Sequence, residues 1–113
     1  MAINSRNKGA AGEREIANKL KEYGYETRRG VQYSGLNGDA DVIGLPRLHL
    51  EIKRVERLNI YDAMNQSKRD ARDNELPVVM HRKNRCEWLV TAPLDVFMQL
   101  YQEWERKMEN KRD

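Results

Sequence analysis

The segment LHLEIKR, residues 48–54, alternates apolar and polar side chains from Leu48 to Lys53. Such alternation is typical of a β-strand with one buried face. Glu51 and Lys53 therefore share the other face of the strand, because side chains two residues apart point the same way. This acid–base pair is either a solvent-exposed ion pair, which contributes little stability, or part of a metal-dependent nuclease site. The neighbouring segments are needed to decide between the two.

The segments around this strand predict a mixed α/β fold. Apolar residues at helical spacing predict three helices, over residues 8–23, 60–72 and 94–108. Short apolar runs between turn residues predict four further strands, over residues 25–33, 40–45, 76–82 and 86–91. The short connection GLPRL makes strands 40–45 and 48–54 an antiparallel hairpin. The whole order predicts a five-stranded mixed sheet flanked by helices, an α+β arrangement.

The second helix has Ile60, Ala63, Met64, Ser67 and Ala71 on its inner face, and the other two helices also carry apolar stripes that predict what they bury. The first is expected to pair Glu15 with Lys19 on its outer face and to bury one stripe, formed by Ile16, Ala17, Leu20 and Tyr23. The third carries Phe97, Leu100, Tyr101, Trp104 and Met108. An aromatic stripe is most often core, but this one is longer than a small five-stranded sheet needs. We therefore expect part of it to form a dimer surface.

Length and composition limit the class of protein. A chain of 113 residues suits one compact domain over residues 1–113, with polar residues 1–7 expected to be frayed and flexible. A net charge of +3 mildly favours a nucleic-acid partner. Cys86 is the only cysteine, which excludes an internal disulfide and a Cys-based zinc site and favours the cytoplasm. We expect Cys86 to be a small apolar strand residue. No apolar run is long enough to span a bilayer, so no membrane association is expected.

Carboxylates on two neighbouring strands predict a metal site. Asp41 opens one strand of the hairpin and Glu51 lies on the other. Two such groups offer the hard oxygen ligands that Mg²⁺ or Mn²⁺ prefers, and the backbone carbonyl of Ile52 can supply a further ligand. An ion there would stabilise the charge that builds up on a cleaved phosphodiester, while Lys53 orients the attacking water. Glu13 points from the first helix toward the sheet, which is costly unless a positive charge meets it.

Asp39 is an alternative to Asp41 as a ligand, and His49 is a further candidate for this site. Asp39 lies two residues before Asp41, but it follows Gly38 and is more simply a turn residue. Asp41 is favoured because it directly precedes the apolar strand, where a ligand is held rigidly. His49 shares the face of Glu51, although a hydrated strand histidine is the simpler interpretation.

Three segments carry a resemblance to a known family. They are KGAAGEREIANKLKEYGYETRRG, SGLNGDADVIGL and LHLEIKR, in this order. Their order resembles that of the archaeal Holliday-junction resolvases and their phage-encoded relatives, in the PD-(D/E)XK nuclease superfamily. The resemblance covers roughly residues 8–91 and implies a restriction-endonuclease-like core. Ala40 stands where the superfamily's name has proline, and the helix over 94–108 has no clear counterpart in the archaeal enzymes.

The resemblance implies roles for individual residues. It assigns catalysis to a set formed by Glu13, Ser34, Asp41, Glu51, Lys53 and Gln66. The metal ligands it implies are Asp41, Glu51 and the Ile52 carbonyl, with Glu13 binding directly or through water. From the residues alone, Ser34 is a loop residue and Gln66 is equally well a solvated helix residue.

These observations predict a magnesium-dependent endonuclease that resolves four-way DNA junctions by paired cuts. Paired cuts require two sites, so we expect a homodimer, in a bacterial host cell if the protein is phage-encoded. The phosphate backbone would be held by basic residues. The candidates are Arg6, Lys8, Arg28, Arg29, Arg54, Lys68, Arg69, Arg72, Arg82, Lys83 and Arg85. The alternatives are a nickase or flap nuclease of the same fold, or a non-catalytic basic module that binds nucleic acid.

Overall fold

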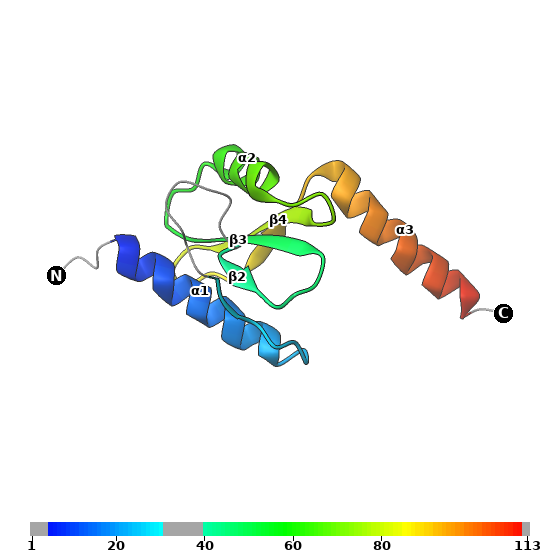
Figure 1. Ribbon diagram of the computed structural model, residues 1–113, viewed down its shortest axis with the longest axis horizontal. Helices are drawn as coiled ribbons and strands as arrows, with labels where there is room; N and C mark the ends of the chain where they lie inside the picture. The colour runs from blue at the N-terminus through cyan, green and yellow to red at the C-terminus, as the bar shows by residue number, and fades with distance from the viewer. Residues whose placement is uncertain (1–4, 31–39, 112–113) are drawn as a thin grey trace.

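The computed structural model describes residues 5–30 and 40–111. The elements run along the chain in the order helix, three strands, helix, two strands, helix, as predicted (Figure 1). They are α1 (Ser5–Lys21), β1 (Arg28–Arg29), β2 (Val42–Ile43), β3 (Leu48–Arg54), α2 (Ile60–Asp70), β4 (Leu76–Arg82), β5 (Leu89–Thr91) and α3 (Leu94–Asn110). None of the helices in these ranges is both long and apolar enough to cross a membrane.

The strands form one mixed sheet in the order β1-β2-β3-β4-β5. Strands β2 and β3 are antiparallel, with Val42 opposite Leu50, which confirms the predicted hairpin. The central pair, β3 and β4, is parallel from Leu48 opposite Leu76 to Arg54 opposite Arg82. Helix α2 connects these two strands, as parallel neighbours require a crossover. The fold is therefore the five-stranded α+β arrangement that the sequence predicts.

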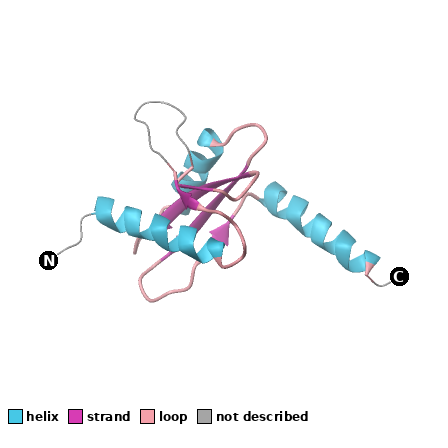
Figure 2. Ribbon diagram, turned by 60° about the horizontal axis from the view of Figure 1, so that its bottom comes forward, coloured by secondary structure: helices cyan, strands magenta, loops and turns pink. Residues whose placement is uncertain are grey.

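Helices α1 and α2 lie on opposite sides of the sheet (Figures 1 and 2). The larger core joins α1 to the sheet and includes Ile16, Leu50 and Ile52. The smaller core joins α2 to Val79 through Ala63 and Met64. Since side chains alternate along a strand, Glu51 and Lys53 lie on the α2 side of β3, opposite Leu50 and Ile52. Glu51 and Lys53 thus lie on the face of β3 opposite the larger hydrophobic core.

A buried hydroxyl fastens α2 to the two central strands. Ser67 Oγ lies 3.1 Å from the His49 carbonyl oxygen and 3.2 Å from the Val78 carbonyl oxygen. Asn59 begins the helix, where its side chain accepts a hydrogen bond from the Asp62 N–H at 3.1 Å. The Ser67 contacts hold the helix beside the face of β3 that carries Glu51, and the cap fixes where the helix begins.

The region before β2 departs from the predicted strand over 25–33, of which residues 31–33 lie outside the described residues. Strand β1 is confined to Arg28–Arg29, and Thr27 is buried with its hydroxyl donating to the Ala17 carbonyl at 2.6 Å. Gly44 has a φ of 105°, and a Cβ there would lie 2.2 Å from the Glu26 carbonyl oxygen. The backbones meet too closely for any side chain at this position.

Two smaller expectations are wrong. Tyr23 lies beyond the end of α1 and is 74% exposed, because the helix stops at Lys21 and the chain turns at Gly24, whose φ is 96°. Cys86 is exposed in the turn before β5 and is not a buried strand residue. Both errors extend a regular element past the point where the backbone turns.

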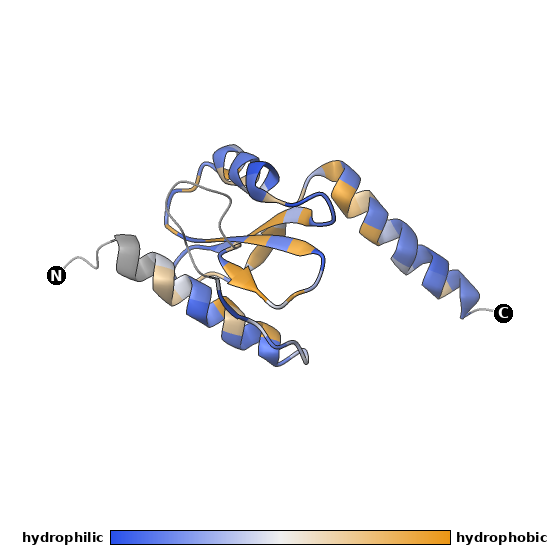
Figure 3. Cartoon of the chain, viewed as in Figure 1, coloured by the Kyte–Doolittle hydropathy of each residue, from blue (hydrophilic) through white to orange (hydrophobic). Residues whose placement is uncertain are grey.

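Helix α3 forms as predicted but does not pack as core. Val96 is its only buried residue, and the helix projects away from the sheet (Figure 1). In Figure 3, hydrophobic colours mark the strands and recur along α3. The described chain is accordingly elongated, with extents of 59 × 33 × 27 Å. The aromatic stripe of α3 is therefore a surface feature.

Candidate active site

Asp41 and Glu51 lie side by side where β2 meets β3. The Ile52 N–H donates to Asp41 Oδ2 at 2.9 Å, and the Asp41 N–H donates to the Leu50 carbonyl at 3.0 Å. Glu51 is 3% exposed in the middle of β3. The antiparallel pairing thus places one half-buried and one buried carboxylate on the same face of the sheet.

The environment of Glu51 opposes its ionisation. Burial, reinforced by the negative charge of Asp41, raises the pKa of Glu51 to about 8, although Lys53 acts in the opposite direction. A carboxylate in a low-dielectric site beside a second carboxylate holds its proton for this reason. The negative charge of Glu51 is therefore destabilised in this site, and a divalent cation bound beside the pair would stabilise it.

Lys53 places a cation beside Glu51. Its Nζ lies 3.5 Å from Glu51 Oε1, and its side chain is 32% exposed, so the ammonium group reaches the solvent edge of the site. Lys53 lines a groove of about 270 Å³ between β3 and α2, and the walls of this groove also include Asn59 and Gln66. Gln66, predicted as a site residue, therefore shares a groove with Lys53.

Glu13 approaches the site from α1. Its side chain is 14% exposed, and Arg29 of β1 forms an ion pair with it at 3.0 Å. Burial raises the pKa of Glu13, the hydrogen bond from Arg29 opposes this, and the charge of Asp41 raises the pKa further. The negative charge of Asp41 therefore acts on Glu13, and the positive charge of Arg29 offsets the negative charge of Glu13.

The donor set fits a hard divalent cation. Asp41 and Glu51 provide carboxylate oxygens, and Mg²⁺ is commonly held by one or two carboxylates together with waters and substrate phosphates. In the described ranges, no group of three or more His, Cys, Asp or Glu side chains is placed to hold a metal ion. Glu13 would therefore join through water or after leaving Arg29.

Several predicted residues cannot be placed. Ser34 and Asp39 lie outside the described residues, as do the side chains of Arg6 and Lys8 at the start of α1. The competition between Asp39 and Asp41 for the ligand role thus stays a prediction.

His49 differs from the expected hydrated strand residue. It is 3% exposed, and its Nδ1 lies 3.5 Å from Glu75 Oε1. The face of β3 that carries it is covered by α2, whose Ser67 contacts the His49 carbonyl oxygen. Alternation places His49 on the correct face but does not reveal that a helix covers it.

The basic residues proposed to hold DNA divide into two kinds. One kind is exposed and is formed by Arg28, Arg29, Lys68, Arg69, Arg72, Lys83 and Arg85. The other kind, Arg54 and Arg82, is partly buried on neighbouring strands. These two arginines meet a carboxylate that sequence reasoning placed elsewhere.

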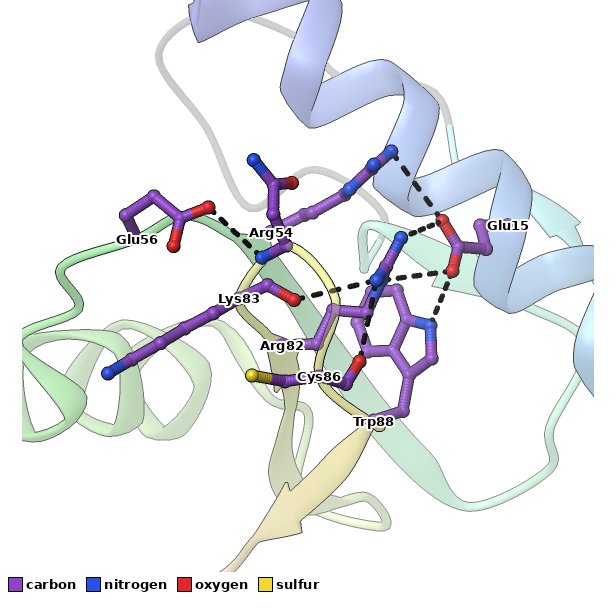
Figure 4. Close-up of polar contacts among 8 residues, drawn as sticks. Glu15, Arg54, Glu56, Arg82, Lys83, Cys86 and Trp88 are labelled. Carbon is purple, nitrogen blue, oxygen red and sulfur yellow. Dashed lines mark hydrogen bonds and ion pairs between the residues drawn. The ribbon is translucent and has the colours of Figure 1, made fainter.

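Glu15 is that carboxylate, and it joins α1 to the ends of β3 and β4 (Figure 4). Its Oε1 accepts from Trp88 Nε1 at 2.8 Å and lies 3.0 Å from Arg82 Nε. Its Oε2 accepts from Arg82 Nη2 at 3.2 Å and lies 3.6 Å from Arg54 Nη1. Burial alone would raise the pKa of Glu15, but hydrogen bonds from Trp88 and Arg82 lower it overall.

The expected pairing of Glu15 with Lys19 on the outer face of α1 is therefore wrong. Glu15 turns inward, because the parallel register sets Arg54 directly beside Arg82 and two adjacent guanidinium groups attract an anion. A signal was present in the sequence, since the strands LHLEIKR and LPVVMHR both end in arginine. Only the register shows that these arginines are neighbours.

Comparison with known proteins decides the family. A family model described as "Phage putative PDDEXK endonuclease" matches residues 4–112. The chain belongs to this family. No curated protein gives a significant match.

The fold of the chain also matches a solved structure. The 1.6 Å structure of Archaeoglobus fulgidus Hjc, described as a Holliday junction resolvase from an archaeal hyperthermophile, is 20% identical in sequence with a TM-score of 0.52. The match covers 75% of this chain and 72% of Hjc. At this identity the likeness establishes the restriction-endonuclease-like fold. The family match and the fold match agree in making the chain a member of a PD-(D/E)XK endonuclease family.

Proposed function

We propose that this member of the family is a divalent-cation-dependent, structure-selective DNA endonuclease that resolves four-way junctions. The observation that supports it most is the Asp41–Glu51 pair with Lys53 Nζ 3.5 Å from Glu51. A solvent-exposed ion pair would not bury a carboxylate beside a second one, since burial without compensation is costly. Such a cost is typical of functional sites.

Each residue of the site has a role in this proposal. Asp41 and Glu51 bind the cation, as does the Ile52 carbonyl, because the N–H and C=O of a strand residue point to the same edge and this N–H faces Asp41. A bound cation would hold the scissile phosphate and stabilise the negative charge that develops on it. Lys53 orients the attacking water from the solvent edge.

Other residues would act around this centre. Gln66 positions substrate or water from the groove it shares with Lys53. Glu13, held by Arg29, contributes through water, and Ser34 is proposed from the resemblance alone. The exposed basic residues bind phosphates, which position DNA without reading its sequence.

The fold match to Hjc and the symmetry of the substrate support the choice of a four-way junction. Resolving a junction requires cuts in two opposed strands, and each chain offers one site. We therefore propose a homodimer with one site in each protomer. We also propose that it acts in the cytoplasm of a bacterial host, which membership of a phage endonuclease family supports.

Cleavage of a labelled substrate panel tests this function. The wild-type protein is incubated with a four-way junction, a flap, a nicked duplex, a linear duplex and a single strand, with Mg²⁺ or with a chelator. We expect paired, Mg²⁺-dependent cuts in the junction and little cleavage of linear duplex. Preferred cutting of the flap or a single nick in duplex would favour the repair-nuclease alternative. Binding without cleavage of any substrate would favour the non-catalytic module.

A further inference from the structure

Helix α3 is attached to the fold only at its beginning. Val96, in its first turn, is 4% exposed and belongs to the core under α1, while every later described residue of the helix is exposed. Two large side chains of its apolar stripe, Phe97 and Trp104, are 54% and 56% exposed. A helix that packed along the sheet would bury this stripe, so its covering surface must come from elsewhere.

The spacing of the stripe identifies the kind of surface. Its members recur at alternating steps of three and four residues: Leu94, Phe97, Tyr101, Trp104 and Met108. This is the strict heptad spacing of a coiled-coil seam, which is narrower than the face of a helix that packs on a sheet. The rings of Phe97 and Tyr101 are 6.3 Å apart, and those of Tyr101 and Trp104 are 5.8 Å apart. The aromatic part of the seam is thus already assembled.

The charge of the helix limits what can cover it. Helix α3 carries four acidic residues and two basic ones. DNA would require the opposite excess. An anionic membrane would likewise require lysine and arginine on the polar face. The occupant is therefore another protein surface with an apolar seam.

The positions of single charges favour a second copy of the same helix. Asp95 lies in the first turn and Lys107 in the last. We propose that α3 packs against α3 of a second copy in antiparallel orientation, with Asp95 of each chain beside Lys107 of the other. This orientation also sets the helix dipoles in opposite directions. A parallel pair would place like charges together at both ends.

The available area is large enough for a dimer. A helix of 17 residues is about 25 Å long at roughly 1.5 Å per residue. A large side chain of this kind buries about 150–250 Å² in total, so the five half-exposed seam residues offer roughly 500 Å² per chain. Two copies would bury about 1,000 Å², which reaches the ~1,000 Å² expected of a specific interface.

The α3 pair would be the interface of the homodimer proposed above, and to that extent it rests on the proposed function. Sedimentation velocity over a wide concentration range tests it without any cleavage assay. We expect wild-type dimers, and Trp104→Glu should weaken dimerisation by roughly 30-fold or more. Gln99→Glu is the matched control, because it adds the same charge to an exposed position off the seam and should leave the dimer unchanged. Circular dichroism establishes that both variants keep their helices.

A charge exchange tests the antiparallel orientation. Asp95→Lys and Lys107→Glu should each weaken the dimer roughly fivefold to tenfold, and the double variant should restore it to within about twofold. The two residues lie at opposite ends of one helix, so rescue requires contact between chains. Both changes oppose the helix dipole, so a purely local effect would make the double variant worse. A monomeric wild type, a dimer insensitive to Trp104→Glu, or absent rescue would each overturn the proposal.

Discussion

The backbone N–H of Ile52 donates a hydrogen bond to the Asp41 carboxylate at 2.9 Å. Through this bond, β3 orients the Asp41 side chain beside Glu51 without help from a cation. Asp41→Asn can keep the hydrogen bond, because the amide oxygen also accepts, but it loses the negative charge. We expect this variant to fold normally and to cleave at least about 100-fold more slowly, since metal ligands are among the most sensitive residues of such sites.

Asp73→Asn is the control for this change, since Asp73 is exposed in the loop after α2. It should leave the cleavage rate within a factor of about two. Junction binding measured by gel shift should survive in both variants, because phosphate contacts by Lys and Arg supply most of the affinity. Equal cleavage by the two variants would remove Asp41 from the site.

Glu51 should make the stability of the cation-free protein depend on pH. Its pKa is raised from 4.5 to about 8 in the folded protein. The unfolded chain releases this proton near pH 4.5, whereas the folded chain retains it up to about pH 8. The contribution of Glu51 to the free energy of unfolding is therefore undiminished below pH 4.5 and falls as the pH rises toward 8.

Glu51→Gln should remove this dependence. Urea unfolding in chelator should give similar stabilities for wild type and variant near pH 5. Near pH 8.5 the variant should be more stable by roughly 2 to 4 kcal/mol. A difference that is the same at both pH values would show that Glu51 is not destabilised by ionisation.

A bound divalent cation should offset the loss of stability that ionisation of Glu51 causes. Binding at Asp41 and Glu51 requires loss of the Glu51 proton, so the affinity for Mg²⁺ should increase as the pH rises from 6 to 8. Thermal unfolding monitored with and without Mg²⁺ should show a stabilisation that grows over this range. Asp41→Asn should abolish the shift in Tm. A pH-independent shift that survives in this variant would place the cation elsewhere.

Glu15 should be important for stability, because it joins α1 to Arg54 and Arg82. Glu15→Gln would leave Arg54 and Arg82 side by side without their carboxylate. We expect a loss of about 1–3 kcal/mol in the free energy of unfolding, reduced by the partial solvent exposure of Glu15. Glu103, which pairs with Arg106 on the surface of α3, provides the control. Glu103→Gln should cost less than about 0.5 kcal/mol, and an equal loss in both variants would contradict the role of Glu15.

Local patterns in the sequence predicted the central part of this fold. The alternation in 48–54 and the apolar run in 76–82 gave strands with the bounds of β3 and β4. The short connection before β3 gave the hairpin that brings Asp41 to Glu51. Each of these elements is determined by residues close together in the chain, so local patterns suffice.

Contacts between distant segments were not predicted. The parallel register of β3 and β4 places Arg54 beside Arg82, and this determines where Glu15 points. The burial of His49 likewise depends on which side α2 covers. Helical spacing predicted α3 but not its projection from the sheet, because periodicity gives an apolar face without showing what covers it.

The most direct test of the nuclease centre is the cleavage rate of a four-way junction by Glu51→Gln, measured with saturating enzyme and Mg²⁺. The substitution keeps the size of the buried side chain and removes the charge that a cation requires. We predict a rate at least about 100-fold below that of the wild type, with junction binding retained. A rate within a few-fold of the wild type would contradict the assignment of Asp41, Glu51 and Lys53 as a cation-dependent nuclease site.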